Sequence, residues 1–352
     1  MKYAIITDQH FCVRGSSQYF INQYRKFYSE VFFPKLDEEN IKLIICLGDT
    51  WEDRKMLNVS GIKAAKEMYF DEAQKRGIKI ITIIGNHDVY YRNTNSVNSM
   101  DFLEHTYDNI EVIYENTVLD LDGFKLALCS WINKENYETQ LKFIETAEAD
   151  VLGGHFEING FEMTRGNVCE SGFKPEIFKR FNEVWSGHFH IKSMIDYIHY
   201  LGNPFQTNKG DIGYERGFHI HDTDTRILTF VKNPFEIYVR HQYDENMDIN
   251  EFDYEQYRDK HVFIDITSML RIDSVKFNTF KDKLNVIAWG AEVVEHEFTN
   301  SDGEVVVDVD YKSNIEIINN YIEVNYSNDE DRSELMYMMD ELHNEALNLR
   351  ED

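Results

Sequence analysis

Eight side chains that can bind divalent metal ions stand in five short segments of the sequence. In chain order they are Asp8 and His10, Asp49, Asn86 and His87, His155, and His188 and His190. A mixture of carboxylate, amide and imidazole donors suits manganese, iron or zinc better than calcium or an all-sulfur site. So many donors indicate two ions, which Asp49 could bridge through its two oxygens. Two ions about 3.5 to 4 Å apart can clamp a phosphate and activate a water, so the pattern predicts phosphoester hydrolysis.

Each of these segments follows a short apolar run that predicts a buried strand. The central run is Ile80–Ile84, after which Gly85 lets the backbone turn sharply. A loop that leaves the end of a rigid buried strand can hold its side chains accurately enough for chemistry. We therefore expect Asn86 and His87 to be fixed by the strand that precedes them.

The spacing within two of the segments makes a further prediction. Because side chains alternate along a strand, Asp8 and His10 are expected to face the same side, and so are His188 and His190. Gly187 would let the backbone approach a bound group closely. Taken singly, each of these residues is more often an ordinary turn, core or surface residue. Their occurrence together at five strand ends favours a metal site.

The order of the predicted elements indicates how the chain is organised. Strands and helices alternate over the first 85 residues, which predicts a parallel α/β half, and 352 residues predict two domains. Later strand-like segments at 236–242, 261–267 and 288–298, with a helix over 274–285, predict a small α+β domain. We expect the boundaries 1–232, 233–312 and 313–352, the last segment being helical.

The chain is acidic, with a formal net charge of −27. Residues 241–352 hold 28 acidic against 9 basic residues. This argues against nucleic acid as a partner, unless metal ions or another subunit supply positive charge. The four cysteines form no Cys-x-x-Cys pair and no apolar run is long enough to cross a bilayer, so we expect a cytoplasmic protein without a membrane partner.

The five segments resemble, in order, the five motifs of the calcineurin-like metallophosphoesterases. These are Asp8-x-His10, Gly48-Asp49, Gly85-Asn86-His87-Asp88, Gly154-His155 and Gly187-His188-x-His190. Within that superfamily the chain is similar to the SbcD-type DNA nuclease subunits, and most of all to the recombination endonuclease nuclease subunits of T-even-like bacteriophages. The resemblance covers residues 1 to 230 and extends to Trp185–His190, Tyr200–Pro204 and Arg216–Phe218.

The resemblance implies an α+β fold, a four-layer α/β/β/α sandwich with a small capping domain and C-terminal helices. It also implies two sets of ligands that share one carboxylate. The first ion would be held by Asp8, His10, Asp49 and His190, and the second by Asp49, Asn86, His155 and His188. His87 would not bind metal but would protonate or stabilise the leaving oxygen. The usual activating metal of the family is manganese.

The resemblance further implies a DNA exonuclease and endonuclease subunit of recombination, repair and replication. It would act as a homodimer with an SbcC-like SMC-family ATPase, in the host cytoplasm if the source is viral. The small domain would cap the site and help hold DNA. The C-terminal helices would dock onto the ATPase, and packing against the chain's own body is the alternative.

Several positions depart from the pattern or lie outside it. Glu52 stands where some nuclease relatives have histidine, and the loop after the central motif offers Tyr90 and Arg92 for substrate contact, a solvated loop being the alternative. A metallophosphatase or cyclic-nucleotide phosphodiesterase is a second hypothesis, disfavoured because Arg54 is out of step by one residue and Asp88 replaces glutamate. A non-catalytic adaptor for the ATPase is a third, disfavoured because a scaffold needs no set of metal ligands.

Overall fold

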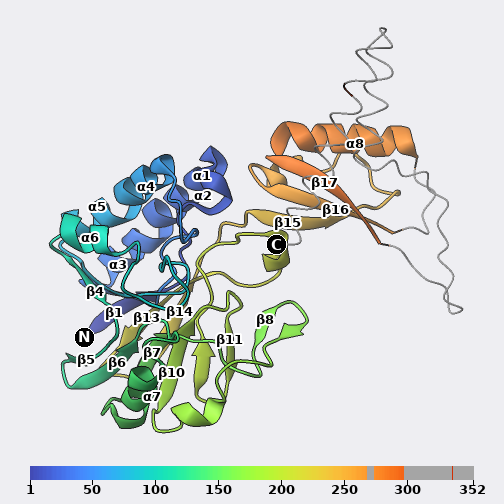
Figure 1. The fold of residues 1–352 in the computed structure, drawn as a ribbon. Helices are drawn as coiled ribbons and strands as arrows, with labels where there is room; N and C mark the ends of the chain where they lie inside the picture. The colour runs from blue at the N-terminus through green and yellow to red at the C-terminus, as the bar shows by residue number, and fades with distance from the viewer. Residues whose placement is uncertain (268–272, 297–334, 336–352) are drawn as a thin grey trace, which may run out of the picture. The chain divides into compact units, whose positions relative to one another are not determined.

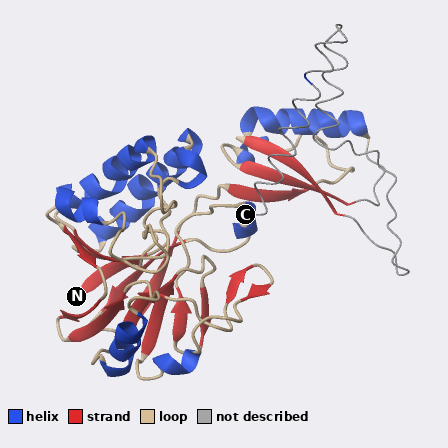
Figure 2. Cartoon of the chain, viewed as in Figure 1, coloured by secondary structure: helices blue, strands red, loops and turns tan. Residues whose placement is uncertain are grey.

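The computed structural model describes residues 1–267, 273–296 and Leu335. Its largest part contains two six-stranded sheets that pack face to face, with helices over the outer face of each (Figures 1 and 2). The predicted four-layer α/β/β/α arrangement is therefore confirmed. No helix within the described ranges has the length and apolar character needed to cross a membrane.

The first sheet has the strand order β14-β13-β1-β2-β3-β4. Its strands are β1 (Lys2–Ile6), β2 (Leu43–Cys46), β3 (Lys79–Ile83), β4 (Ile110–Ile113), β13 (Gly217–Asp222) and β14 (Ile227–Lys232). Strands β1 to β4 pair in parallel, as predicted, while β13 runs antiparallel to β1. The carboxyl ends of β1, β2 and β3 therefore meet at one edge of the sheet.

The second sheet has the order β11-β12-β10-β7-β6-β5. Its strands are β5 (Asn116–Leu121), β6 (Phe124–Cys129), β7 (Val151–His155), β10 (Glu183–Gly187), β11 (Ser193–Ile195) and β12 (Ile198–Tyr200). Strand β7 pairs in parallel with both β6 and β10, and its register sets His155 opposite Gly187. This pairing brings the ends of β7 and β10 together, although 32 residues of sequence separate them. A separate hairpin is formed by β8 (Glu162–Thr164) and β9 (Asn167–Val168).

Helices cover both outer faces. The first sheet is covered by α2 (Gln18–Phe27), the π-helical turn η1 (Tyr28–Phe32), α3 (Phe33–Glu38), α4 (Val59–Ala65), the π-helical turn η2 (Lys66–Phe70) and α5 (Asp71–Lys75). The second is covered by α7 (Tyr137–Thr146) and the 3₁₀ turn η3 (Pro175–Phe178). The other helical segments are α1 (Val13–Ser16), α6 (Asp101–Thr106), η4 (Lys209–Asp211), η5 (Tyr254–Tyr257) and α8 (Ser274–Ile287).

The alternation of apolar residues along β1 explains the layers. Ala4 and Ile6 pack against the helices, whereas Tyr3 and Ile5 pack against the second sheet. A strand that is apolar on both faces must be covered on both, which is typical of parallel strands. Each fully buried isoleucine contributes about 1.5–3 kcal/mol relative to an exposed one, so β1 is held firmly on both sides.

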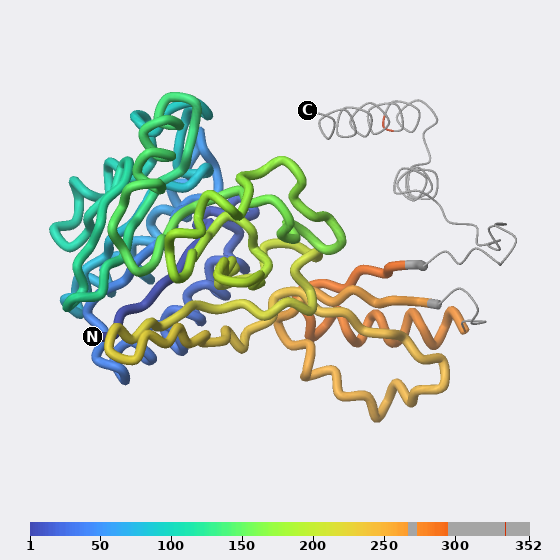
Figure 3. The backbone as a smooth tube through the Cα atoms, turned by 90° about the horizontal axis from the view of Figure 1, so that it is seen from below, coloured from blue at the N-terminus to red at the C-terminus, as the bar shows by residue number. Residues whose placement is uncertain are grey.

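Beyond β14 the chain forms a three-stranded sheet with one helix (Figure 3). The strands are β15 (Tyr238–Gln242), β16 (His261–Thr267) and β17 (Gly290–His296), and Phe280 of α8 packs on the ring of Tyr243. These elements confirm the strands and helix predicted for this region. Contacts group residues 1–265 and 272–294 in one unit and 266–271 and 295–352 in another, so the boundaries at 232 and 312 stay predictions. The predicted C-terminal docking helices lie outside the described residues.

Candidate metal centre

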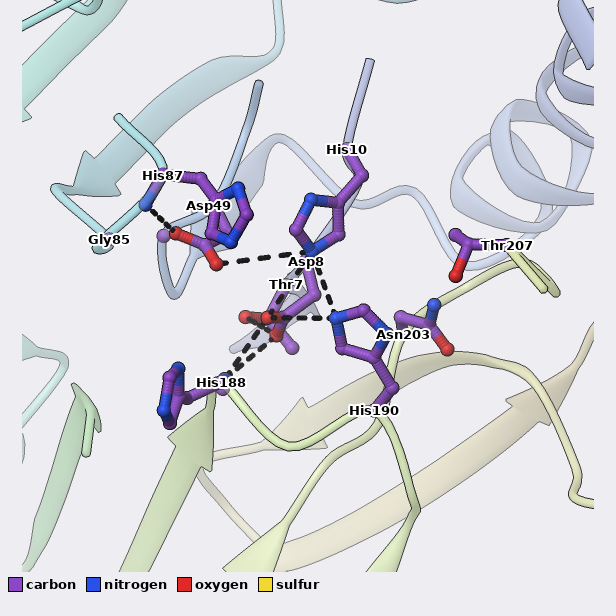
Figure 4. Close-up of polar contacts among 12 residues, drawn as sticks. Thr7, Asp8, His10, Asp49, Gly85, His87, His188, His190, Asn203 and Thr207 are labelled. Carbon is purple, nitrogen blue, oxygen red and sulfur yellow. Dashed lines mark hydrogen bonds and ion pairs between the residues drawn. The ribbon is translucent and has the colours of Figure 1, made fainter. Parts of the chain in front are cut away.

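The predicted metal-binding side chains converge from loops at the ends of β1, β2, β3, β7 and β10 (Figure 4). Two groups of three side chains have ligand atoms within 4.8 Å of one another and could each hold an ion. They are Asp8 with His10 and His190, and Asp49 with His155 and His188. Asn86 joins the second group. All seven residues predicted as metal ligands are therefore brought into one site.

The first group is built around two imidazole rings. The Nε2 atoms of His10 and His190 lie 2.9 Å apart, and Asp8 Oδ1 lies 3.8 Å from the first and 3.9 Å from the second. Asp49 Oδ2 is 3.9 Å from His10 Nε2. Two imidazole nitrogens and two carboxylate oxygens that face the same point form a donor set suited to a divalent cation.

The second group is more deeply buried. His155 Nε2 lies 3.2 Å from Asp49 Oδ2 and 2.9 Å from Asn86 Oδ1, and His188 Nδ1 lies 2.8 Å from the same amide oxygen. The Nδ1 atom of His155 is 2.8 Å from the carbonyl oxygen of Leu47, which can only accept. The neutral ring therefore carries its proton on Nδ1 and presents the Nε2 lone pair to the site. Asp49 borders both groups and so occupies the position of a bridging ligand.

The backbone at these residues is unusual. Asp8, His10, Asp49 and His188 have φ values of 51°, 47°, 50° and 86°. Left-handed conformations of non-glycine residues are uncommon and cluster at functional sites. Strand β1 ends at Ile6 and β10 at Gly187, and the ligands lie in the loops that follow. The prediction that strand alternation aligns Asp8 with His10, and His188 with His190, is therefore wrong, because sharp turns bring them together.

Two glycines make room for the carboxylates. A Cβ atom at Gly85 would lie 2.2 Å from Asp49 Oδ1, and one at Gly187 would lie 2.1 Å from Thr7 Oγ1 and 2.8 Å from Asp8 Oδ2. These distances are far below van der Waals contact. The expectation that Gly187 lets a bound group approach the backbone needs correction, since the space is filled by the side chains of Thr7 and Asp8.

Asp88 ties two of the loops together. Its carboxylate accepts hydrogen bonds from the backbone N–H groups of Gly85, at 2.9 Å, and Trp51, at 3.2 Å. Burial, together with the charge of Asp49, raises the pKa of Asp88 to about 6. Asp88 thus stabilises the loops after β2 and β3 and keeps Asp49 close to Asn86. Sequence reasoning treated this residue only as part of the motif.

Electrostatics divide the four histidines of the two groups into pairs. Burial lowers the pKa of His10, but Glu52, Asp49 and Asp8 outweigh it and raise the value to about 9. The pKa of His155 is raised to about 9 in the same way, against its burial, mainly by Asp49. Burial lowers the pKa of His188 and His190 to about 3. Despite its own burial, Asp49 has a pKa far below its usual range because His155 and His10 surround it.

His87 stands apart from the two groups. Its backbone N–H donates to Asp49 Oδ1 at 2.8 Å, and its Nδ1 lies 2.5 Å from the carbonyl oxygen of Glu52. The carbonyl accepts the Nδ1 proton and leaves Nε2 without a hydrogen-bond partner among residues 1–267 and 273–296. His87 belongs to a third group of possible ligands with His10 and Glu52. Its ring meets that of His10 edge to face, with centroids 5.0 Å apart.

Glu52 and Arg54 enter the site without having been predicted. Glu52 Oε2 lies 2.8 Å from His10 Nδ1, on the opposite side of the ring from the metal-facing Nε2. A carboxylate at this position orients a ligating histidine and raises its basicity. Burial and the charge of Arg92 lower the pKa of Arg54, and Asp49 opposes this effect. The only sequence signal for Arg54 was its near match to the phosphatase pattern.

Tyr90 and Arg92, predicted to contact substrate, lie in the exposed loop after β3. Tyr90 is 41% exposed and its ring packs edge to face on Tyr91. Neither Arg54 nor Arg92 has an ion-pair partner within the described part of the chain. Two guanidinium groups that influence each other near Asp49 suit an anionic ligand. A role for Tyr90 in substrate contact stays a prediction.

Comparisons with known proteins agree with this geometry. The model of the family described as calcineurin-like phosphoesterase matches residues 1–192, which include all five segments. Exonuclease subunit 1 of Enterobacteria phage T4 is 29% identical over 302 residues, covering 85% of this chain and 86% of the relative. Among solved structures, an archaeal phosphodiesterase gives a TM-score of 0.35 at 14% identity over 66% of this chain and 100% of that chain. A dimetal phosphatase from Danio rerio gives 0.40 at 10% identity over 62% and 91%.

Proposed function

Because the chain belongs to the calcineurin-like phosphoesterase family, a family of metal-dependent hydrolases, we propose that it is a two-metal DNA nuclease. The observation that carries the proposal is the pair of donor groups that meet at Asp49. The relative from phage T4 is named as an exonuclease subunit and matches most of both chains. Its name supports DNA as the substrate and a phosphodiester as the bond that is cleaved.

The donor set fits two divalent ions, and manganese suits this mixture of oxygen and nitrogen ligands. Asp8, His10, Asp49 and His190 hold the first, and Asp49, Asn86, His155 and His188 hold the second. Bound ions would neutralise the phosphate charge and activate a water for attack. The two groups share Asp49, so one carboxylate sets the spacing between the ions.

The remaining residues act on the phosphate and the leaving group. His87 is fixed at its backbone N–H by Asp49 and at Nδ1 by the Glu52 carbonyl, so its Nε2 is oriented by contacts that do not use that atom. It donates a proton to the departing oxygen or stabilises its charge. Arg54 and Arg92 bind phosphate oxygens and supply positive charge that the acidic chain otherwise lacks near the site.

We further propose that the chain works with a partner subunit, in the cytoplasm. A net charge of −27 leaves little basic surface for DNA, and the relative from phage T4 is itself named as a subunit. An SbcC-like SMC-family ATPase would supply DNA binding and gating, and a homodimer of this chain would present two metal centres. The three-stranded sheet with α8 would help position DNA.

A substrate panel tests the proposal. The purified chain is titrated with manganese, alone and with the ATPase, on end-labelled duplex DNA, single-stranded DNA, nitrophenyl phosphate and cyclic nucleotides. The proposal expects hydrolysis of DNA that depends on added metal and stops with chelator. Hydrolysis of nitrophenyl phosphate or cyclic nucleotides with none of DNA would replace it by the phosphatase or cyclic-nucleotide phosphodiesterase alternative. Metal binding without hydrolysis of any ester would favour the adaptor.

A further inference from the structure

A cavity of about 430 Å³ lies beside the metal centre, and its role is not explained by metal binding. His155, a member of the second donor group, forms part of its wall. The other residues that matter here are Trp131, Lys134, Tyr137, Glu157 and Phe173. Its volume falls within the range of about 300 to 1,000 Å³ that small-molecule sites occupy. A group bound in this cavity would therefore touch the wall of the metal site.

Aromatic rings from two loops form the cavity. Trp131 follows β6, and its ring centroid lies 5.4 Å from that of His188 and 6.0 Å from that of His155. The rings of Tyr137 and Phe173 are nearly parallel, 20° from coplanar, with centroids 6.2 Å apart. Tyr137 is 43% exposed. Exposed aromatic faces next to a phosphate-binding site are suited to stacking against the bases of a nucleic acid.

The polar groups of the cavity are largely engaged with one another. Asn133, in the cavity wall, donates to Asn95 and accepts from the backbone of Glu135. Ser171 donates to Glu157. Lys134 has no ion-pair partner within the described ranges, so its ammonium is available to an anionic ligand. Few hydrogen-bonding groups remain to distinguish one planar ligand from another.

We propose that this cavity holds a base of the DNA strand whose phosphate reaches the metal centre. Trp131 and Tyr137 provide stacking surfaces, Lys134 contacts an adjacent phosphate, and the site accepts all four bases because it lacks free groups to distinguish them. This inference rests on the proposed nuclease function. It adds a position and a recognition mode for the nucleotide next to the cleaved bond.

Nucleotide binding to the manganese-loaded full chain tests the inference. Deoxyadenosine monophosphate, thymidine monophosphate and 2-deoxyribose 5-phosphate are titrated by calorimetry and by quenching of tryptophan fluorescence. We expect both nucleotides to bind roughly tenfold more tightly than the sugar phosphate, since the sugar phosphate cannot stack. Equal affinity for all three ligands would overturn the inference.

Variants identify the cavity. Tyr137→Leu keeps an apolar side chain without an aromatic face and should reduce the preference for nucleotides several-fold, while Tyr137→Phe should retain it. Trp131→Leu should act in the same direction and abolish the quenching assigned to that ring. Should Trp131→Leu not fold, the pair at Tyr137 still decides the matter. A preference unchanged in Tyr137→Leu would contradict the placement of the base.

The two proposals fail in different ways. A chain that cleaves DNA but shows no preference for nucleotides over the sugar phosphate keeps the nuclease function and loses the base site. A chain that prefers nucleotides in a manner sensitive to Tyr137→Leu, yet cleaves no DNA, keeps the base site and loses the nuclease function.

Discussion

The substitution Gly187→Ala tests whether close packing of ligand loops creates the metal centre. The new methyl group would lie 2.1 Å from Thr7 Oγ1, 2.8 Å from Asp8 Oδ2 and 2.8 Å from the carbonyl oxygen of Leu47. The last atom belongs to the backbone at the end of β2 and cannot rotate away. Either β10 or the loop that carries Asp8 must move.

The cost has two parts. Overpacking of a tight site costs about 1–3 kcal/mol. The displaced Asp8 carboxylate also loses its hydrogen bonds from Thr7, at 2.6 Å, and from the His188 backbone, at 3.1 Å. Hydrogen bonds to charged groups contribute about 1.5–3 kcal/mol each. Loss of one of them together with the overpacking gives a total of about 3–6 kcal/mol, divided between the free energy of unfolding and the free energy of metal binding.

Urea unfolding and manganese titration measure these two quantities. The matched control is Gly290→Ala, because a Cβ atom there meets only His261, at 3.4 Å, an ordinary contact. We expect Gly187→Ala to unfold at lower urea and to lose at least tenfold in manganese affinity, and Gly290→Ala to change neither appreciably. If Gly187→Ala bound two manganese ions as tightly as the unsubstituted chain and unfolded at the same urea concentration, the packing argument would be refuted.

Three further substitutions probe the catalytic group, the loop anchor and a buried histidine. His87→Ala should lower DNA hydrolysis about 10²–10⁴-fold because the proton donor is lost, while calorimetry still detects two manganese ions; loss of an ion would make His87 a ligand. Asp88→Asn leaves a buried backbone N–H without its acceptor and should reduce the free energy of unfolding by about 1–3 kcal/mol in urea, whereas Asp53→Asn, at an exposed carboxylate that also accepts two N–H groups, should cost less than about 0.5 kcal/mol; equal costs would remove the anchoring role. Burial, followed by the charges of Lys192 and His199, lowers the pKa of His219 to about 3. The unfolded chain therefore takes up this proton near pH 6.5 and the folded chain does not, so stability falls as the pH drops from about 6.5 towards 3, by up to about 1.4 kcal/mol per unit. Urea midpoints from pH 5 to 7, with chelator present, should show a shallower slope for His219→Leu, and identical slopes would contradict this assignment.

Much of the architecture could be predicted because burial leaves a direct pattern in the sequence. The run Ile80–Ile84 predicts a strand covered on both faces, and β3 (Lys79–Ile83) is such a strand. The predicted strand 261–267 agrees with β16 at both ends. Ligand types at the ends of parallel strands then predict one shared site, since parallel strands bring their carboxyl ends to one edge.

The geometry within the site could not be predicted in the same way. Left-handed backbone at Asp8 or Asp49 has no sequence signal, because only the surrounding structure makes such a conformation tolerable. Strand periodicity consequently gave the wrong reason for a correct grouping. Glu52 was also hidden, since its contact with His10 joins loops that are 42 residues apart in the chain. The base cavity depends on two loops of the second sheet that no local motif connects.

The hydrogen bonds of the two carboxylates explain why these residues form one unit. Asp8, after β1 of the first sheet, accepts the backbone N–H of His188, after β10 of the second. Asp49, after β2, accepts the N–H of His87, after β3. Each carboxylate thus fixes the loop of another functional residue while keeping oxygen atoms directed at the ions. Substitutions at Asp8 and His188 should therefore be non-additive in metal affinity although the residues belong to different donor groups, because each one already disturbs the loop of the other.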